Sequence, residues 1–582
     1  MSDAHPHGIE PNLSASSADM GLVGHTPSEK RAVYLTLLPC FALTVLLGLA
    51  SNGVHQDDDL AHFLMARWAC WFPEYLLHFW GRPGLTLPLA AVTVFDDPAW
   101  SWHAARLLSA CVTAIAALAA ARLAMRLHVR PAWAVVLACY LQPLNSLLAA
   151  TTLTENFAAC YLVLAVALLA AGRRVGASAV FSMTLVTRHE MILLLPLWWL
   201  ALLAQRTSPA RAATALAIST WALVTHNVLF RIFLGSWPVQ AFFQPRGSTE
   251  YAATGLLGYV PHALEAVPPV IAGLAILGGI VFVGRGRPLI PALVACYFAG
   301  HTAAVAFGFF ASGGFGRFMV TVAPLVAILA VAGVREMTEP QPRPRARGLG
   351  WLVLAASWAV GLLAFEVERG AGRLAVEDER LIWLIRSVSA IAAVLAVASW
   401  YLVRRVRPSR VMPRVAAVLL AMTCVIQWVF LVRPLRVRSE QRQVAVVVDW
   451  LIENSMDRQP IFAPNPWVAY YLGFVEFPRA HKGPALLESM PAGTIVVWDP
   501  IYSPNDFHRL PLSVLTSSRE YEELEHFQGS GRRPIEVVLF RKNSPALTPP
   551  APDTSYPIDL MSQGNPAYGM YYVSTGIRPA RP

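Results

Sequence analysis

Long apolar runs separated by short polar stretches fill most of this chain. A helix that crosses a bilayer needs roughly 20 apolar residues, and about 13 segments approach this template. They are 32–50, 104–126, 131–149, 156–171, 175–187, 190–204, 211–234, 268–284, 288–311, 316–334, 349–366, 381–403 and 411–432. The fifth and sixth segments are short, so one bent unit is an alternative there. The pattern predicts a mostly α, polytopic membrane protein of about 13 transmembrane helices.

The charges between these runs predict how the helices are oriented. Cytoplasmic loops of membrane proteins are short and carry an excess of Lys and Arg. If the N-terminus, with Lys30 and Arg31, is cytoplasmic, every second loop is short and basic, as at Arg173 and Arg174. The opposite loops carry acids, aromatic residues and prolines. An odd number of crossings then places the C-terminal region on the outer side of the membrane.

The remaining stretches set the domain boundaries that we expect. Residues 1–31 are polar and lack an apolar core, which is typical of a disordered cytoplasmic tail and not of a signal peptide. Residues 32–432 form the transmembrane module, in which 51–103 is a Trp-rich outer loop suited to interfacial helices. Residues 433–543 alternate helix and strand patterns and predict a small outer α/β domain. Residues 544–582 are rich in Pro and are expected to be irregular.

Composition supports a membrane protein and excludes several other classes. Of the 582 residues, 55% are hydrophobic and 14% are charged, whereas ordinary globular chains have about 45–50% and 25%. The net charge of +10 comes from short basic clusters between apolar runs, and no basic domain indicates a nucleic-acid partner. The seven cysteines lie almost all in apolar runs without a CxxC spacing. Disulfide and zinc frameworks are therefore not expected.

Three consecutive acids, Asp57, Asp58 and Asp59, follow the first apolar run in the stretch QDDDLAHFLMAR. Adjacent carboxylates repel one another, so at least one pKa should be raised unless a cation or a hydroxyl group relieves the repulsion. In a cleft that excludes water, such a cluster favours proton abstraction or metal binding. The alternative interpretation is a solvated loop that ends the first helix.

Three further polar points lie at the ends of apolar segments, where ionisable groups are costly and indicate function. They are TEN at 154–156 with Glu155, TRHE at 187–190 with Arg188, His189 and Glu190, and GGFGRF at 313–318 with Arg317. Glu155 has an alternative role in a helix N-cap, and Arg317 has one as an interfacial arginine. Carboxylates beside several arginines at one outer face suit a lipid donor that carries phosphate, since arginines offset the charge of the leaving group.

Five motifs resemble, in order, those of polyprenyl-phosphate-dependent glycosyltransferases with the GT-C fold, such as protein O-mannosyltransferase-like enzymes and lipid A aminoarabinose transferases. DDLAHFLMAR (58–67) is similar to the family's DE-xxY-xxxAR signature, with His62 in place of the tyrosine. GRPGLTLPLAAV (81–92) is similar to KPPLxxWL, LTENF (153–157) to RTDxxL, TRHEMILLLP (187–196) to TKGPxxLLLP, and GRFMVTVAP (316–324) to GRYLLPxxP. The resemblance covers roughly residues 33–334.

The resemblance implies roles for individual residues. Asp58 falls on the family's catalytic acid and would act as the general base, with Asp59 and Glu155 orienting this base or the acceptor. The donor phosphate would be held by Arg82, Arg188 and Arg317, and secondary polar contacts would come from Asp57, His62, His189 and Glu190. A divalent cation, Mg²⁺ or Mn²⁺, is left open. Its candidate ligands are Asp58 and Glu155, but Gly81 stands where some members carry an acid.

The function that we expect is an inverting glycosyltransferase of a bacterial inner membrane. It would move a hexosyl or pentosyl group from a polyprenyl-phosphate donor to a hydroxyl of a glycan, lipid or protein on the periplasmic side. One alternative is a polymerase or ligase of lipid-linked glycans. A second is a lipid or solute transporter, although the chain shows none of the internal repeats common among transporters. A non-catalytic scaffold with the same fold is a third.

Overall fold

The computed structural model describes the whole chain except residues 1–26, 78–80, 96, 206, 235–236, 239–252, 309–313, 339–343, 372–378, 406–410, 474–486, 489, 505–509, 530–534, 546–571 and 575–582. Most of the first tail and most of the last tail therefore lie outside the described residues. The expectations for those stretches stay predictions.

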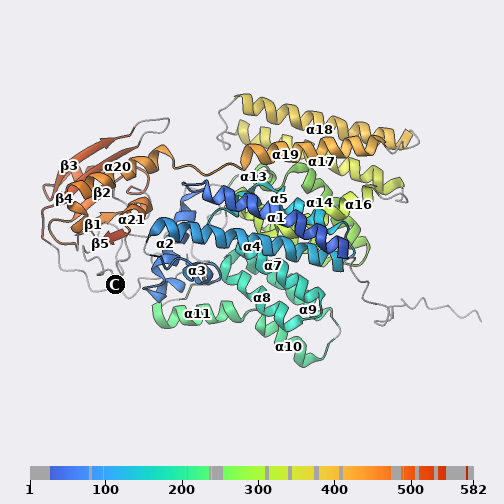
Figure 1. The fold of residues 1–582 in the computed structure, drawn as a ribbon, viewed down its shortest axis with the longest axis horizontal. Coiled ribbons are helices and arrows are strands. Elements are labelled where there is room, and N and C mark those ends of the chain that lie inside the picture. Colours follow the sequence, from blue (N-terminus) through green and yellow to red (C-terminus); the bar gives the residue numbers. More distant parts are fainter. Residues whose placement is uncertain are drawn as a thin grey trace, which may run out of the picture.

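A helical bundle occupies the first three quarters of the chain (Figure 1). Its long helices are α1 (Pro27–Leu49), α4 (Pro98–Arg126), α7 (Glu155–Ala170), α8 (Arg174–Thr187), α11 (Trp221–Leu234), α14 (Pro269–Gly284), α15 (Leu289–Phe307), α16 (Ala323–Thr338), α17 (Pro344–Gly370), α18 (Glu379–Arg405) and α19 (Val411–Leu431). Shorter helices lie between them: α2 (Asp57–Trp68), η1 (Pro73–Leu76), α3 (Pro83–Ala90), α5 (Ala132–Tyr140), α6 (Pro143–Leu148), η2 (His189–Leu194), α9 (Leu195–Leu203), α10 (Pro209–Ile218), α13 (Val260–Ala266) and η4 (Gly316–Val322).

Two helices begin earlier than their apolar runs indicate. Helix α1 starts at Pro27, inside the stretch predicted to be a disordered tail, so that prediction is wrong for residues 27–31. Helix α4 starts at Pro98 because Asp97 caps it: the Asp97 carboxylate accepts from the backbone N–H of Ala99 at 2.7 Å, and a proline at the first helical position fits the free helix end.

Fewer helices than predicted are long enough to cross a bilayer alone. Six described helices have the length and apolar character of a span, or up to eight if each of two bent pairs counts as one. The predicted number of about 13 includes segments that are short of a span in the structure, such as 156–171 and 175–187, where α7 has 16 residues and α8 has 14. It also includes 131–149, which is divided into α5 and α6. The two bent pairs are α10–α11, with a bend of 46°, and α13–α14, with a bend of 95°. Apolar runs predict membrane segments well but do not show where a segment is broken.

Polar side chains form hydrogen bonds with free backbone carbonyls where one apolar run is interrupted. Between α5 and α6, the amide of Gln142 donates to the carbonyls of Ala138 (3.1 Å) and Ala323 (2.9 Å). Asn145 donates to Cys139 at 3.0 Å and Ser146 to Tyr140 at 2.5 Å. A broken helix at membrane depth is tolerated when its free backbone groups are paired in this way. Specific hydrogen bonds therefore stabilise the interruption between α5 and α6.

The centre of the bundle packs backbone against backbone at two glycines. A Cβ atom on Gly278 of α14 would lie 1.9 Å from the carbonyl oxygen of Leu329 in α16. A Cβ atom on Gly333 of α16 would lie 2.1 Å from the carbonyl oxygen of Leu274 in α14. Small residues allow such close packing between membrane helices, where dispersion contacts replace the hydrophobic effect as the driving force.

After α19 the chain forms a mixed sheet with helices. The five-stranded sheet has the order β3-β4-β2-β1-β5, with β1 (Ile461–Ala463) and β2 (Ile495–Trp498) parallel. The remaining strands are β3 (Tyr521–Gln528), β4 (Glu536–Lys542) and β5 (Tyr572–Ser574), and the pairs β1–β5, β2–β4 and β3–β4 are antiparallel. The helical elements of this part are α20 (Ser439–Glu453), η5 (Met456–Arg458), α21 (Pro466–Leu472) and α23 (Leu512–Ser517). Because β5 pairs with β1, the prediction of an irregular 544–582 tail is wrong for these three residues.

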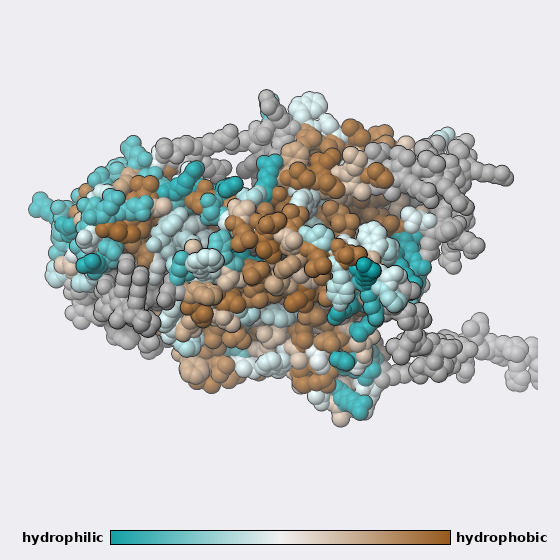
Figure 2. Space-filling model, viewed as in Figure 1, coloured by the Kyte–Doolittle hydropathy of each residue, from teal (hydrophilic) through white to brown (hydrophobic). Residues whose placement is uncertain are grey.

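The sheet region packs on α2, at one end of the bundle (Figure 1). An aromatic cluster joins the two parts: Trp102 of α4 stacks on Phe63 of α2 at 5.5 Å between ring centroids and meets Tyr470 of α21 edge-on at 4.9 Å. Figure 2 shows hydrophobic residues over the visible face of the bundle and hydrophilic residues over the sheet region. This distribution fits a multi-pass membrane protein with a polar region outside the membrane.

Candidate functional site

The predicted polar points come together in one ionic cluster beside the N-terminus of α2. Arg317, in η4, forms ion pairs with Asp58 of α2 and with Glu155 of α7, the latter at 3.3 Å between Nη1 and Oε1. Arg188, between α8 and η2, pairs with the same Glu155 oxygen at 2.5 Å and with Glu190. Side chains separated by up to 259 residues in the chain therefore share one site.

Interrupted helices bring these side chains to one place. Arg188 is extended between α8 and η2, with φ at −142°, so the helix ends and the side chain turns into the bundle. Arg82 precedes α3 in the left-handed region, with φ at 50°, a conformation that non-glycine residues rarely adopt. A Cβ atom on Gly316 would lie 2.1 Å from the His262 carbonyl oxygen, so only glycine lets η4 approach α13 this closely.

Glu155 is the shared counter-ion of two guanidinium groups. Its side chain has no exposed surface, and the side chains of Arg188 and Arg317 are only 3% and 7% exposed. A buried carboxylate is stable when cations and hydrogen bonds compensate for lost water. The position of Glu155 fits the holding of both arginines better than direct contact with an acceptor.

Arg82 is the third arginine of the site and lies beside Arg188. Its guanidinium donates to the Thr154 hydroxyl at 3.3 Å, and Arg188 donates to the same oxygen at 3.0 Å. Burial and the nearby charge of Arg188 lower the pKa of Arg82 to about 10. Like charges held this close are stabilised by an added anion. The site therefore suits a phosphate group.

Aromatic side chains that the sequence did not single out line the cluster. The ring of Phe318 lies 4.6 Å from the Arg188 guanidinium and 5.5 Å from that of Arg317. His301 of α15 stacks on Phe318 at 4.9 Å between ring centroids, and Tyr297 approaches Glu190 at 3.4 Å. The face of an aromatic ring attracts a cation, which partly compensates a buried guanidinium group for the loss of water. Because these residues sit inside apolar runs, only the position of Phe318 directly after Arg317 offered a signal.

The three consecutive acids have three different surroundings. Asp58 pairs with Arg317 and keeps 15% of its side chain exposed. Asp59 is fully buried, and its Oδ1 accepts from both the backbone N–H and the hydroxyl of Thr152 at 2.6 Å. Burial raises the pKa of Asp59, against the lowering effect of these bonds and of Arg106. Asp59 thus anchors the loop before α7, and of the three acids Asp58 pairs directly with a site arginine.

Asp57 faces the sheet region. The hydroxyl of Tyr502, which follows β2, hydrogen-bonds to Asp57, and burial raises the pKa of this carboxyl. The guanidinium of Arg438 donates to the carbonyl of the nearby His55 at 3.2 Å. Asp499, at the end of β2, is also buried, and burial raises its pKa to about 6. The sheet region therefore forms one wall beside the acidic run.

The histidines predicted as secondary contacts are also at the site. His62 lies one helical turn after Asp58 on the same face of α2, and its side chain is buried. Burial, and then the charges of Arg82, Arg317 and Arg188, hold the pKa of His62 well below its usual value, so it is neutral at pH 7. His189 opens η2, directly after Arg188.

The predicted metal ligands do not fit a divalent cation in this arrangement. Asp58 and Glu155 both pair with Arg317, whose guanidinium occupies the position between them. Within the described ranges, no group of three or more His, Cys, Asp or Glu side chains is arranged to hold a metal ion. The positive charge that faces these carboxylates comes from the arginines.

Comparison with known proteins connects this geometry to a fold. No protein-family model matches the chain, and no curated protein matches it either. Two crystal structures of ArnT from Cupriavidus metallidurans, one bound to undecaprenyl phosphate and one in the apo state, are similar with a TM-score of 0.54 and 15% sequence identity. The first match covers 87% of this chain and 97% of that chain, and the second 88% and 98%.

This chain has the ArnT fold. The GT-C-type glycosyltransferase fold predicted from the five motifs is confirmed over most of the chain. At 15% identity the likeness describes the course of the backbone and not the chemistry. The roles of the clustered side chains must therefore be argued from their own geometry.

Proposed function

We propose that the protein is a membrane glycosyltransferase that uses a polyprenyl-phosphate-linked sugar as its donor and transfers the sugar to a hydroxyl acceptor. The observation that carries this proposal is the cluster of Arg82, Arg188 and Arg317 beside Asp58, inside an ArnT fold. One of the similar ArnT structures is bound to undecaprenyl phosphate. Three buried guanidinium groups supply the donors that a phosphate headgroup needs.

The ion pair between Arg317 and Asp58 suggests how donor binding makes Asp58 available as a general base. A phosphate oxygen that binds Arg317 competes with Asp58 for the guanidinium, and the carboxylate is released toward the acceptor. Asp58 then takes the proton of the acceptor hydroxyl. A bond forms between that oxygen and the anomeric carbon, while the bond from this carbon to the phosphate oxygen breaks. Attack opposite the leaving group inverts the configuration.

The polyprenyl phosphate leaves with the electrons of the broken bond. Arg188 and Arg82 balance the charge that develops on it, and Glu155 keeps Arg188 and Arg317 in place throughout. Preorganised charges of this kind act most strongly in a site from which water is excluded. The Phe318 ring under the two guanidinium groups supports such an environment.

The orientation that we propose follows the charge pattern of the loops. The basic loops lie in the cytoplasm, and the site and the sheet region lie on the periplasmic side of a bacterial inner membrane. In this arrangement 32–432 is the catalytic module and 433–543 the periplasmic α/β domain. The acceptor hydroxyl belongs to a glycan, lipid or protein that reaches α2 from the side of Tyr502 and Asp57.

The test incubates the purified full chain with a panel of polyprenyl-phosphate sugars and follows released polyprenyl phosphate and transferred sugar by mass spectrometry. We expect release with at least one donor. The variant Arg82→Ala should lose it, while the control Arg386→Ala should keep it. Arg386 pairs with Glu366 on exposed faces of α17 and α18, far from the site in sequence. Movement of intact donor across a vesicle bilayer, without cleavage, would instead identify a transporter.

A further inference from the structure

One hydroxyl group lies between two arginines of the ionic cluster. The Thr154 oxygen accepts from Nη1 of Arg188 at 3.0 Å and from Nη1 of Arg82 at 3.3 Å. The same hydroxyl group donates to Oε2 of Glu155 at 3.4 Å. A hydroxyl group has one donor and two acceptor positions, so these three contacts use all of them. Because Thr154 is only 1% exposed, bulk water has little access to this oxygen.

The Thr154 side chain does not cap the helix that follows it. A threonine directly before a helix normally accepts a hydrogen bond from the backbone N–H of the second or third helical residue. Thr154 stands directly before α7, but its backbone is helical, with φ at −73° and ψ at −23°, and its side chain makes no capping bond. The hydroxyl group is directed at the two arginines instead. Capping of α7 therefore does not explain this side chain.

The backbone segments that carry the two arginines are in close contact. Gly84 lies two residues after Arg82. A Cβ atom at this glycine would lie 2.0 Å from Oγ1 of Thr187, the residue directly before Arg188. The Tyr161 hydroxyl of α7 donates to the Gly84 carbonyl at 3.0 Å. This packing of α3, α7 and α8 fixes where both arginine side chains begin. It does not fix their guanidinium ends, because an arginine side chain is long and has many rotamers.

We propose that Thr154 is a positioning residue, whose hydroxyl group holds the guanidinium groups of Arg82 and Arg188 at the spacing that binds one donor phosphate. This role rests on the proposed sugar transfer. Thr154 acts through the two arginines and contacts no substrate, and Glu155 fixes the orientation of its hydroxyl group. Guanidinium groups that are already oriented bind a phosphate without the cost of ordering them. A neutral hydroxyl group also accepts their N–H bonds without itself neutralising the cations.

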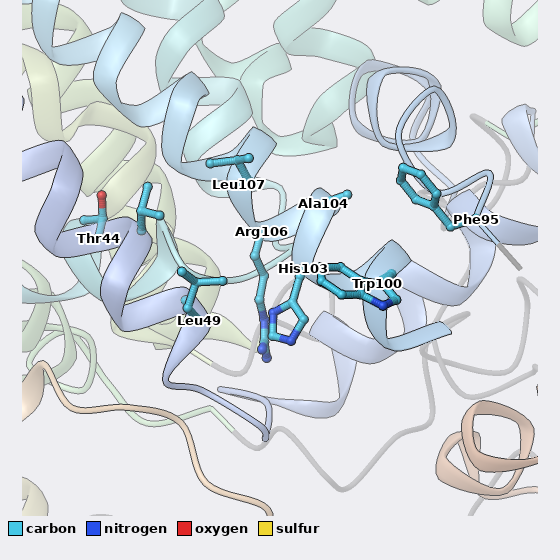
Figure 3. A pocket seen from close by; sticks show the side chains of 10 residues that line it. Thr44, Leu49, Phe95, Trp100, His103, Ala104, Arg106 and Leu107 are labelled. Carbon is cyan, nitrogen blue, oxygen red and sulfur yellow. The ribbon is translucent and has the colours of Figure 1, made fainter. Parts of the chain in front are cut away.

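The test compares three substitutions. Thr154→Val keeps the shape of the side chain and removes the hydroxyl group, whereas Thr154→Ser keeps the hydroxyl group. Thr44→Val is the matched control: Thr44 is 2% exposed, and its hydroxyl group donates to the Phe41 carbonyl of its own helix at 2.7 Å. Thr44 lines an apolar groove between α1 and α4 (Figure 3), which neither Thr154 nor the two arginines line.

Two properties of the full chain in detergent are measured: the dissociation constant for undecaprenyl phosphate, and the steady-state transfer of sugar at varied donor and acceptor concentrations. We expect Thr154→Val to weaken binding and to lower the donor kcat/KM, each by about 10- to 100-fold, because two charged donors lose their acceptor. The KM for the acceptor should not change. Thr154→Ser and Thr44→Val should stay within about threefold of the wild type. Partial unfolding would lower only the active fraction and leave the dissociation constant of the folded protein unchanged.

A double-mutant cycle tests whether Thr154 acts through Arg82. The binding of undecaprenyl phosphate is measured in Arg82→Ala with and without Thr154→Val. If the hydroxyl group works by orienting Arg82, the effect of Thr154→Val should shrink by at least about threefold when this arginine is absent. An undiminished effect would contradict the proposal.

The outcomes separate this role from the proposed function. Sugar transfer and lipid phosphate binding by Thr154→Val at the wild-type level would overturn the positioning role and leave the proposed function intact. An equal loss in Thr154→Ser or in Thr44→Val would overturn it as well. A wild type that neither binds undecaprenyl phosphate nor transfers sugar would overturn both. If Thr154→Val does not fold, Thr154→Ala takes its place in the comparison with Thr154→Ser.

Discussion

Replacing Glu155 by Gln tests whether one buried carboxylate holds the phosphate-binding arginines. The substitution keeps the shape of the side chain but removes the charge that faces Arg188 at 2.5 Å and Arg317 at 3.3 Å. Because Glu155 is fully buried, two guanidinium groups would lose their shared counter-ion without water to replace it. Breaking a buried pair from one side costs about 3–5 kcal/mol of unfolding free energy.

The chain offers a matched control for this substitution. Glu366 also contacts two arginines, Arg386 at 2.6 Å and Arg369 at 3.2 Å, but its side chain is 31% exposed. Exposed pairs contribute about 0–1 kcal/mol. Glu366→Gln should therefore lower the free energy of unfolding by no more than about 1 kcal/mol.

Equilibrium unfolding of both variants in mixed detergent, with and without undecaprenyl phosphate, gives the comparison. The added phosphate should stabilise Glu155→Gln more than the wild type, because it supplies the negative charge that the variant lacks. A loss below about 1 kcal/mol for Glu155→Gln would refute the role of Glu155 as a buried counter-ion. The same stabilisation of both proteins by the lipid phosphate would show that it does not bind at these arginines.

Three further outcomes are expected. Arg317→Ala should weaken donor use by about 2–5 kcal/mol, measured as the change in donor kcat/KM, and an unchanged donor response would leave Arg317 with a structural role. Gly278→Ala should lower the free energy of unfolding by about 1–3 kcal/mol, because the new Cβ atom would lie 1.9 Å from the Leu329 carbonyl oxygen. Gly279→Ala should not lower it in this way, because the nearest contact of its Cβ atom would be at 3.6 Å. Burial raises the pKa of Asp499 from 3.8 to about 6, so the folded protein binds this proton more tightly than the unfolded chain does. The free energy of unfolding should therefore fall by about 3 kcal/mol as the pH rises from about 4 to 6. Asp499→Asn should remove this pH dependence. The same slope in the variant between these pH values would assign that dependence to other groups.

The clustering of the candidate site residues was predictable from the sequence, because ionisable residues at the ends of apolar runs are costly and indicate function. Asp58, Glu155, Arg188 and Arg317 were each found in this way, and the structure joins them in ion pairs. The sequence did not show which of the adjacent acids contacts an arginine of the cluster. Asp59 has the same residue type as Asp58, but the loop that ends in Thr152 covers it. Such a contact depends on tertiary structure.

The fold was predictable in class and not in detail for a related reason. Apolar runs are set by the membrane, whereas the breaks inside them depend on long-range pairing, such as the bond from Gln142 to the Ala323 carbonyl. Strand β5 was missed because a segment of three residues gains its order from β1, more than 100 residues earlier in the chain. Local pattern alone carries no such information.

The central claim is that Asp58 takes the proton of the acceptor while the clustered arginines hold the donor phosphate. The most direct measurement compares sugar transfer and undecaprenyl phosphate binding in the wild type and Asp58→Asn. The account predicts a loss of transfer of about 10²- to 10⁴-fold with lipid phosphate binding retained or strengthened, because the amide no longer competes as an anion for Arg317. Transfer by Asp58→Asn at the wild-type rate would contradict it.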